Sequence, residues 1–239
     1  MKIGITLRAF LILCMAWLCM QPSGAQPTPR NLAGDAASAV DLVFPAAPIP
    51  LAEANYPQML LLKPEGQGPF PAVVLGHQCG GLVFSKTQPQ AANWSMLEWA
   101  KRYQQAGYVA LLVDFMGPRG AQQVCQGPQN GVTLGRSTQD FFQAAAHLRK
   151  FNFVLPDQIA LVGFSQGALL ALVTPLKTAG KPVQLHTYPS ETHCFDCKSL
   201  NGFTKPGRLG TVTYTYSEAA TLDSFERTKA FLQESFKTK

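Results

Sequence analysis

The 239-residue sequence has few charged residues, no basic cluster and no internal repeat. Only 14% of its residues are charged and 46% are hydrophobic, which excludes an intrinsically disordered chain, since disorder requires low hydrophobicity and high charge. Lysine and arginine are scattered, and the net charge of +6 is mild for this length, so a nucleic-acid partner is not expected. The lack of repeats excludes a fibrous protein. The sequence therefore predicts a single globular domain.

Long hydrophobic runs are also missing, and the most apolar segment lies at the N-terminus. Two basic residues precede the uncharged run Ala9–Met20, which is shorter than the roughly 20 residues that a membrane-spanning helix needs. Small residues ending at Ala25 follow, as they do before a signal-peptidase cut. We predict a signal peptide over residues 1–25, cut near Ala25, and one mature domain over 26–239 in the periplasm or outside the cell. No stable membrane anchor would remain after cleavage; an uncleaved anchor is the alternative.

Short strand patterns alternate with helical patterns in the rest of the chain. The continuous apolar runs Ala72–Gly76, Val109–Val113 and Ile159–Gly163 are typical of strands buried on both faces of a parallel sheet. Apolar residues at helical spacing predict helices over Trp94–Ala106 and Thr138–Lys150 between them. This alternation implies right-handed crossovers and a mostly parallel α/β sheet with helices on both faces.

Four of the six cysteines lie beyond residue 25, and an even number in an exported protein favours pairing. Cys79 and Cys125 lie on loops at the carboxyl ends of adjacent predicted strands, so we expect them to form a disulfide. Cys194-x-x-Cys197 is expected to be a structural bridge or a pair of inert thiols. A redox motif is the alternative, although the pair does not open a helix after a strand. One such pair cannot complete a four-cysteine zinc site, and we expect no metal.

A serine stands in a sequence context that favours nucleophilic catalysis. The segment Gly163-Phe164-Ser165-Gln166-Gly167 follows the third buried strand directly and precedes a helical pattern over Gln166–Leu172. A nucleophile elbow has this form, because the glycines allow close backbone approach and the helix N-terminus favours developing negative charge. We therefore predict that Ser165 is a nucleophile. A structural turn lined by glycines is the alternative.

Two loops carry the other candidate groups. The glycine-rich loop His77–Gly81 follows the first buried strand, so we expect the backbone amides of Cys79 and Gln166 to hold an oxyanion. Cys79 needs only its amide for this, so a disulfide at the same residue is compatible with it. His193 follows the last predicted strand, Val183–Tyr188, and is the candidate general base. The other three histidines lie in a strand, a helix and the oxyanion loop.

These segments resemble the dienelactone hydrolase family, in particular its exported bacterial members, over most of the predicted mature chain. The matching segments are Pro69–Val74, His77–Leu82, Ala106–Ala110 with Asp114, Gly117–Gly120, Asp157–Gly167, Tyr188-Pro189, His193–Asp196 and a final helix over Glu218–Phe236. The resemblance implies an α/β hydrolase fold whose nucleophile, histidine and aspartate cleave carboxylic esters or lactones through a covalent acyl-enzyme, without a metal or other cofactor. It assigns Ser165 as the nucleophile and His193 as the base. Gln78 stands where many exported relatives have glycine.

The segment between Ser165 and His193 departs from the family pattern. It is too short for the helix, two strands and triad aspartate that the family places there, and it has no acidic residue before Glu191. We interpret this as an internal deletion that removes one or two late strands, so that the last strand packs where an earlier one normally would. The candidates for a substitute acid are Glu191, Asp196 and Asp114. Asp114 more naturally braces its loop with Arg119, and the acid could be absent altogether.

The sequence supports two main hypotheses. The first is a serine hydrolase whose partner is a small ester or lactone. The second is a non-catalytic or degenerate relative that keeps the pocket but lacks the acid of the triad. A third, less favoured, is a thiol oxidoreductase that uses Cys194 and Cys197.

Overall fold

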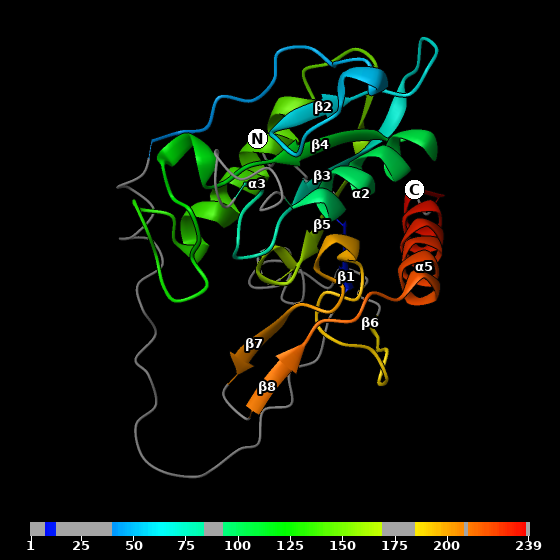
Figure 1. The fold of residues 1–239 in the computed structure, drawn as a ribbon. Coiled ribbons are helices and arrows are strands. Elements are labelled where there is room, and N and C mark those ends of the chain that lie inside the picture. The colour runs from blue at the N-terminus through cyan, green and yellow to red at the C-terminus, as the bar shows by residue number, and fades with distance from the viewer. Residues whose placement is uncertain (1–7, 13–39, 84–92, 169–184, 208–209, 238–239) are drawn as a thin grey trace, which may run out of the picture.

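A single mixed β-sheet forms the centre of the computed structural model, which describes residues 8–12, 40–83, 93–168, 185–207 and 210–237 (Figure 1). The strand order is β2-β4-β3-β5-β1-β6; β2 runs antiparallel to β4, and the other neighbours are parallel. The strands are β1 (Arg8–Ile12), β2 (Leu60–Leu62), β3 (Phe70–Gly76), β4 (Val109–Val113), β5 (Val154–Phe164) and β6 (Leu185–His186). The architecture is the α/β hydrolase-like fold that the sequence predicts.

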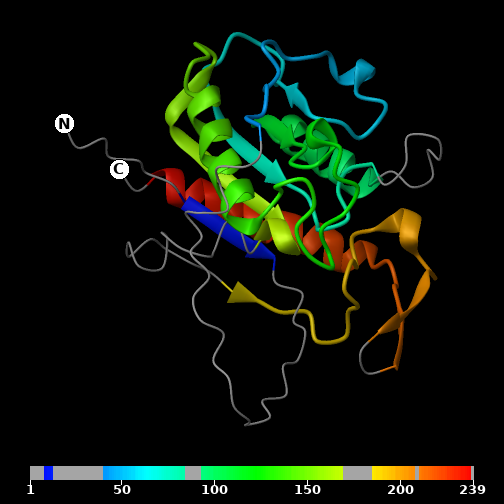
Figure 2. The ribbon, with the colours of Figure 1, turned by 90° about the vertical axis from the view of Figure 1, so that its left-hand side faces the viewer.

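Three long helices cover the sheet on its two faces. Their bounds are α2 (Trp94–Gln105), α3 (Leu134–Leu148) and α5 (Glu218–Lys237). Short 3₁₀ helices are η2 (Leu51–Glu53), η4 (Gly117–Arg119) and η5 (Lys198–Leu200). The antiparallel hairpin of β7 (Thr204–Gly207) and β8 (Gly210–Thr213) stands away from the central sheet in both views (Figures 1 and 2). No helix in the described ranges combines the length and apolar character needed to span a membrane.

Alternating side chains of the central strands build two cores. Val74 on β3 and Leu111 on β4 pack with Phe141 of α3 on one face. Their strand neighbours, such as Leu75, pack with α2 and α5 on the other face. Because both faces are covered, β3, β4 and the end of β5 carry no exposed side chain, which is why they appear in the sequence as continuous apolar runs.

The predicted helices are confirmed with shifts at their ends. The first covers Trp94–Gln105, one residue shorter than expected. The second begins at Leu134 rather than at Thr138, because the Thr133 side chain accepts a hydrogen bond from the Arg136 amide and caps an earlier first turn. The helix expected after Ser165 is present over 166–168; its residues 169–172 lie outside the described ranges, as do 183–184 of the expected last strand.

The strand beside β5 differs from expectation. We expected the last strand to take this position, but β1 lies between β5 and β6, with Arg8 opposite Ala160 and Ile12 opposite Phe164. A bare β5 edge would leave unpaired backbone groups, and an apolar extended segment can satisfy them. α5 lies alongside β1 (Figure 2). The strand therefore comes from residues 1–25, the segment that we predict to be a signal peptide.

Candidate active site

Ser165 occupies the sharp turn between β5 and the following helix. Its φ is +52°, a left-handed value that non-glycine residues rarely adopt. A Cβ atom at Gly163 would collide with the backbone of Gly167, and one at Gly167 would collide with the backbone of Gly76. The two glycines are therefore required for the helix to start this close to the strands. This is the geometry of a nucleophile elbow, which presents a serine at the end of the sheet.

One of the two predicted oxyanion amides, that of Gln166, follows Ser165 directly, and the other belongs to Cys79, which lines the same cavity as Ser165. Gln166 is the first helical residue, so its N–H has no partner within the helix. The carbonyl of Cys79 accepts a hydrogen bond of 2.8 Å from Val124 N–H, whereas the amide of Cys79 donates to no group in the described parts of the chain. The expected Cys79–Cys125 disulfide is present and fixes the same loop. Both amides are thus available to a ligand oxygen.

His77 and Asp114 support the loop rather than the reaction. The buried His77 ring lies 2.7 Å from Gln78 O through Nδ1, and its Nε2 accepts a 3.2 Å hydrogen bond from Phe115 N–H. Asp114 accepts hydrogen bonds from the amides of Met116 and Gly117. Burial raises the pKa of Asp114, but His77 and these amides outweigh it and hold the pKa below its usual value. Asp114 is therefore occupied within its own loop and beside His77.

The expected pairing of Asp114 with Arg119 is wrong. Arg119 instead forms a buried two-pronged ion pair with Asp140 on α3, at 2.7 and 2.9 Å. The guanidinium also donates to the carbonyls of Phe115 and Val40. The loop after β4 is thus tied to α3, and a planar guanidinium fits this set of acceptors well.

His193 lines the same cavity as Ser165. Although the residue is exposed at the cavity mouth, protein atoms crowd its ring; this desolvation and the positive charge of Lys205 lower the pKa of His193. The ring stands 6.3 Å from the ring of Tyr214, centroid to centroid. Within the described residues it makes no hydrogen bond to Ser165 or to a carboxylate. These surroundings favour the neutral form of His193, and no carboxylate among the described residues is hydrogen-bonded to it.

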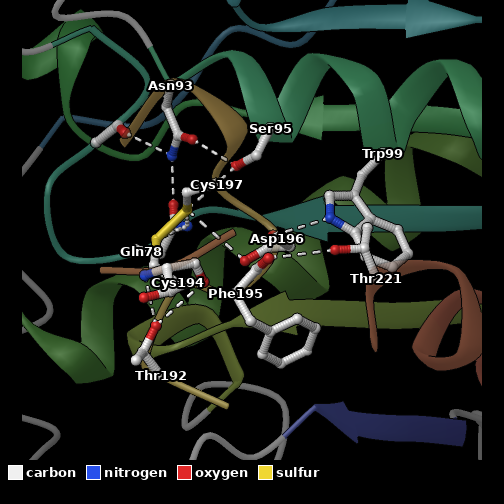
Figure 3. The surroundings of a disulfide bond; sticks show 12 residues. Gln78, Asn93, Ser95, Trp99, Thr192, Cys194, Phe195, Asp196, Cys197 and Thr221 are labelled. Atoms are coloured by element: carbon white, nitrogen blue, oxygen red, sulfur yellow. Dashed lines mark hydrogen bonds between the residues drawn. A yellow bond between two sulfur atoms is a disulfide. The ribbon is translucent and has the colours of Figure 1, made fainter. Parts of the chain in front are cut away.

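The other two candidate acids have different partners. Glu191 accepts a 2.9 Å hydrogen bond from the hydroxyl of Ser217, just before α5 begins. Asp196 accepts a 3.0 Å hydrogen bond from the Trp99 indole and points toward that ring in Figure 3. Burial raises the pKa of Asp196, although the Trp99 hydrogen bond opposes the shift. Among the described residues, none of the three candidates forms a hydrogen bond or ion pair with His193.

A cavity of about 460 Å³ opens above Ser165 and His193. Its walls include the four disulfide-bonded cysteines and, from the segment between η5 and the end of β8, Leu200, Phe203, Lys205 and Tyr214. These last four residues were not predicted from the sequence, because short polar strands such as β7 and β8 carry no clear hydrophobic alternation. Lys205 supplies a positive charge to a wall that is otherwise largely apolar.

Cys194 and Cys197 form the second disulfide. Together with Asp196 they bring possible metal-ligand atoms within 4.8 Å of one another. With the two sulfurs bonded to each other, this group has no thiolate to offer a metal. The C-x-x-C pair is therefore a bridge at the cavity wall.

Comparisons with known proteins give little further information. No protein-family model matches the chain, and no curated protein matches it. Among solved structures, the chain is similar to a "putative dienelactone hydrolase" from Klebsiella pneumoniae subsp. pneumoniae MGH 78578, at 12% sequence identity and a TM-score of 0.40. The match covers 72% of this chain and 91% of that chain. A likeness of this size does not indicate the function of this chain.

Proposed function

We propose that this protein is a serine hydrolase of the dienelactone hydrolase type, which cleaves small carboxylic esters or lactones through a covalent acyl-enzyme and without a cofactor. The observation that carries the proposal is the backbone of Ser165. Its φ of +52° places it on a strand-to-helix turn, and its side chain lines one cavity with His193. The resemblance of the sequence to this family supports the same assignment.

Each of the proposed site residues has a distinct role in the reaction. Neutral His193 takes the proton of Ser165 as the hydroxyl attacks the carbonyl carbon, and the amides of Cys79 and Gln166 stabilise the oxyanion. His193 then protonates the leaving alcohol, and a water molecule activated by the same ring releases the acid. A hydrogen bond between catalytic groups often tightens only when substrate binds, so its absence in the free protein is compatible with this role.

The missing acid limits the rate. Without a carboxylate behind His193, the ring is not held in one tautomer and the imidazolium is not stabilised. Loss of the corresponding aspartate in a serine protease lowers turnover about 10⁴-fold. The positive charge of Lys205 further disfavours the imidazolium. We therefore propose a slow esterase.

We also propose that the protein is exported, with cleavage near Ala25, to the periplasm or the medium. The two disulfides are compatible with an oxidising compartment outside the cytoplasm. Sequencing the N-terminus of the protein recovered from the medium or periplasm tests this, and a first residue near Gln26 is expected. A recovered chain that still begins at Met1 would contradict it.

One observation favours a second candidate, a pocket that binds an ester without cleaving it. His193 lacks both a carboxylate partner and a contact with Ser165 across the described residues. A relative that lost its acid would keep the cavity and the oxyanion amides, and these suffice to hold a carbonyl group. Measuring ester hydrolysis by the folded protein separates the two candidates.

The test is hydrolysis of a short-chain nitrophenyl ester by the wild-type chain and by Ser165→Ala, with circular dichroism to show that both are folded. The matched control is Ser199→Ala, because Ser199 lines the same cavity but lies on η5. We expect Ser165→Ala to lower kcat at least about 100-fold and Ser199→Ala to change it less than about threefold. Equal rates in all three folded proteins would reject the hydrolase and favour the binding protein.

A further inference from the structure

The Cys194–Cys197 disulfide closes a loop only three residues apart in sequence. In the chain-entropy model a disulfide stabilises a fold more as its loop grows, so this bond stabilises the fold less than the one between Cys79 and Cys125. Cys79–Cys125, in contrast, spans 46 residues and joins loops that a Val124 to Cys79 hydrogen bond already holds together. A purely structural role therefore explains the second disulfide poorly.

The two sulfurs of this disulfide differ in accessibility. Both cysteines line the cavity, but Cys194 is half-buried whereas Cys197 is only 3% exposed. A thiol that enters the cavity therefore meets Cys194 first. Thiol–disulfide exchange needs this asymmetry, with one sulfur open to attack and a second that leaves and later returns.

Polar groups surround both sulfurs (Figure 3). The amide nitrogen Nε2 of Gln78 lies 3.8 Å from Cys194 Sγ and 3.7 Å from Cys197 Sγ. The Ser95 hydroxyl lies 3.8 Å from Cys197 Sγ and donates a 2.8 Å hydrogen bond to Asn93, whose side-chain amide in turn contacts Gln78. The Ser95 hydrogen is used by Asn93, so Gln78 Nε2 is the donor to the sulfurs, and such a donor favours a thiolate and makes the sulfur a better leaving group.

A carboxyl group stands beside the buried sulfur. Asp196 Oδ1 lies 3.7 Å from Cys197 Sγ, while the other oxygen is held by Trp99. Burial raises the pKa of Asp196, so this carboxyl holds a proton at higher pH than an exposed aspartate does. It is placed to protonate a thiolate that forms on Cys197.

We propose that Cys194–Cys197 is a thiol–disulfide exchange site that oxidises small dithiols entering the cavity. A substrate thiolate attacks Cys194 Sγ; the Cys194–Cys197 bond breaks, a substrate–Cys194 disulfide forms, and Cys197 leaves as a thiolate that takes the proton of Asp196. The second substrate thiol then attacks the substrate sulfur of that mixed disulfide, and Cys194 leaves. The two electrons lost by the dithiol now reside on Cys194 and Cys197. Its two thiol protons pass to the solvent, from which Asp196 regains the proton that it gave to Cys197 and the leaving thiolate of Cys194 takes the other. A low-molecular-weight disulfide such as oxidised glutathione restores the bridge.

The first test uses the wild-type chain, so it does not depend on any variant folding. The protein is mixed with dithiothreitol, free thiols are alkylated at intervals, and peptide mapping follows each cysteine. We expect Cys194–Cys197 to open at least about tenfold faster than Cys79–Cys125, which is the internal control. Equal opening rates of the two disulfides, or faster opening of Cys79–Cys125, would overturn the proposal.

The second test traps the intermediate with oxidised glutathione. In Cys197→Ser the accessible Cys194 remains, and we expect it to form a mixed disulfide with glutathione. In the matched variant Cys194→Ser only the buried Cys197 remains, and we expect at least about tenfold less adduct under the same conditions. Similar adduct levels in the two folded variants would overturn the assignment of Cys194 as the attacked sulfur. The assay contains no ester, so its result is independent of the proposed hydrolysis.

Discussion

The two halves of the sheet are built very differently. The four-strand half (β2, β4, β3 and β5) comes from one stretch of chain, residues 60–164, and its inner strands are buried on both faces. The two-strand half consists of β1 and β6, whose described residues come from distant parts of the sequence. Ser165, the proposed nucleophile, follows the first half, whereas His193, the proposed base, follows the second.

This difference separates the two parts of the proposed mechanism. Ser165 and the amides of Cys79 and Gln166 are held by close backbone packing and by a disulfide across the four-strand half. His193 follows β6, and among the described residues no carboxylate orients it. Catalysis requires both groups in register within a fraction of an ångström. A tightly packed turn at Ser165 therefore does not ensure that His193, the proposed base, is held in a fixed orientation.

The largest expected effect removes a tie in the four-strand half. Asp140→Asn leaves the buried guanidinium of Arg119 without a carboxylate, and breaking one side of a buried pair costs about 3–5 kcal/mol of unfolding free energy. The matched control is Asp41→Asn, because the Asp41 side chain is 74% exposed in its ion pair with Arg136. We expect that control to cost less than about 1 kcal/mol in urea unfolding. Similar losses in both variants would show that the four-strand half does not depend on this pair.

A smaller effect is expected from removing β1. A chain that begins at residue 26 lacks the partner of β5, so the amides of β5 lose protection from hydrogen exchange. We expect β5 exchange to accelerate about tenfold or more, equal to about 1.4 kcal/mol of local opening free energy. The amides of β3 and β4 serve as the control within the same molecule and should keep their rates. Unchanged exchange in β5 would mean that another segment takes the position of β1.

The smallest expected effect concerns the pH dependence of the base. Only neutral His193 can accept a proton, so kcat/KM falls as pH drops through its pKa, which desolvation and Lys205 lower. Removing the charge in Lys205→Met raises this pKa toward its ordinary value, and the acid limb of the profile moves to higher pH. Lys198→Met is the control and should leave the limb in place. A limb that does not move in Lys205→Met, measured with a neutral ester, would exclude this electrostatic influence.

Local patterns in the sequence were sufficient to predict β3, β4, most of the buried part of β5 and the turn at Ser165. Runs such as Val109–Val113 identify strands buried on both faces, and Ser165 could be found because its glycines and its place after a strand are both local features. The partner of β5 was missed because a strand pattern does not specify which strand will pair with it. The partner of Arg119 was missed for a related reason: Asp114 is near in sequence, but helix packing brings Asp140 to the guanidinium.

The position of β1 in the sheet makes folding and export compete for the same residues. The residues that we predict to direct export are also the residues that close the sheet against β5. In a chain that folds completely before export, the predicted signal peptide is paired with β5 and is not accessible for recognition. If export and cleavage come before folding, the mature chain lacks β1 and its sheet is one strand narrower. The order of folding and export therefore determines whether the sheet contains β1.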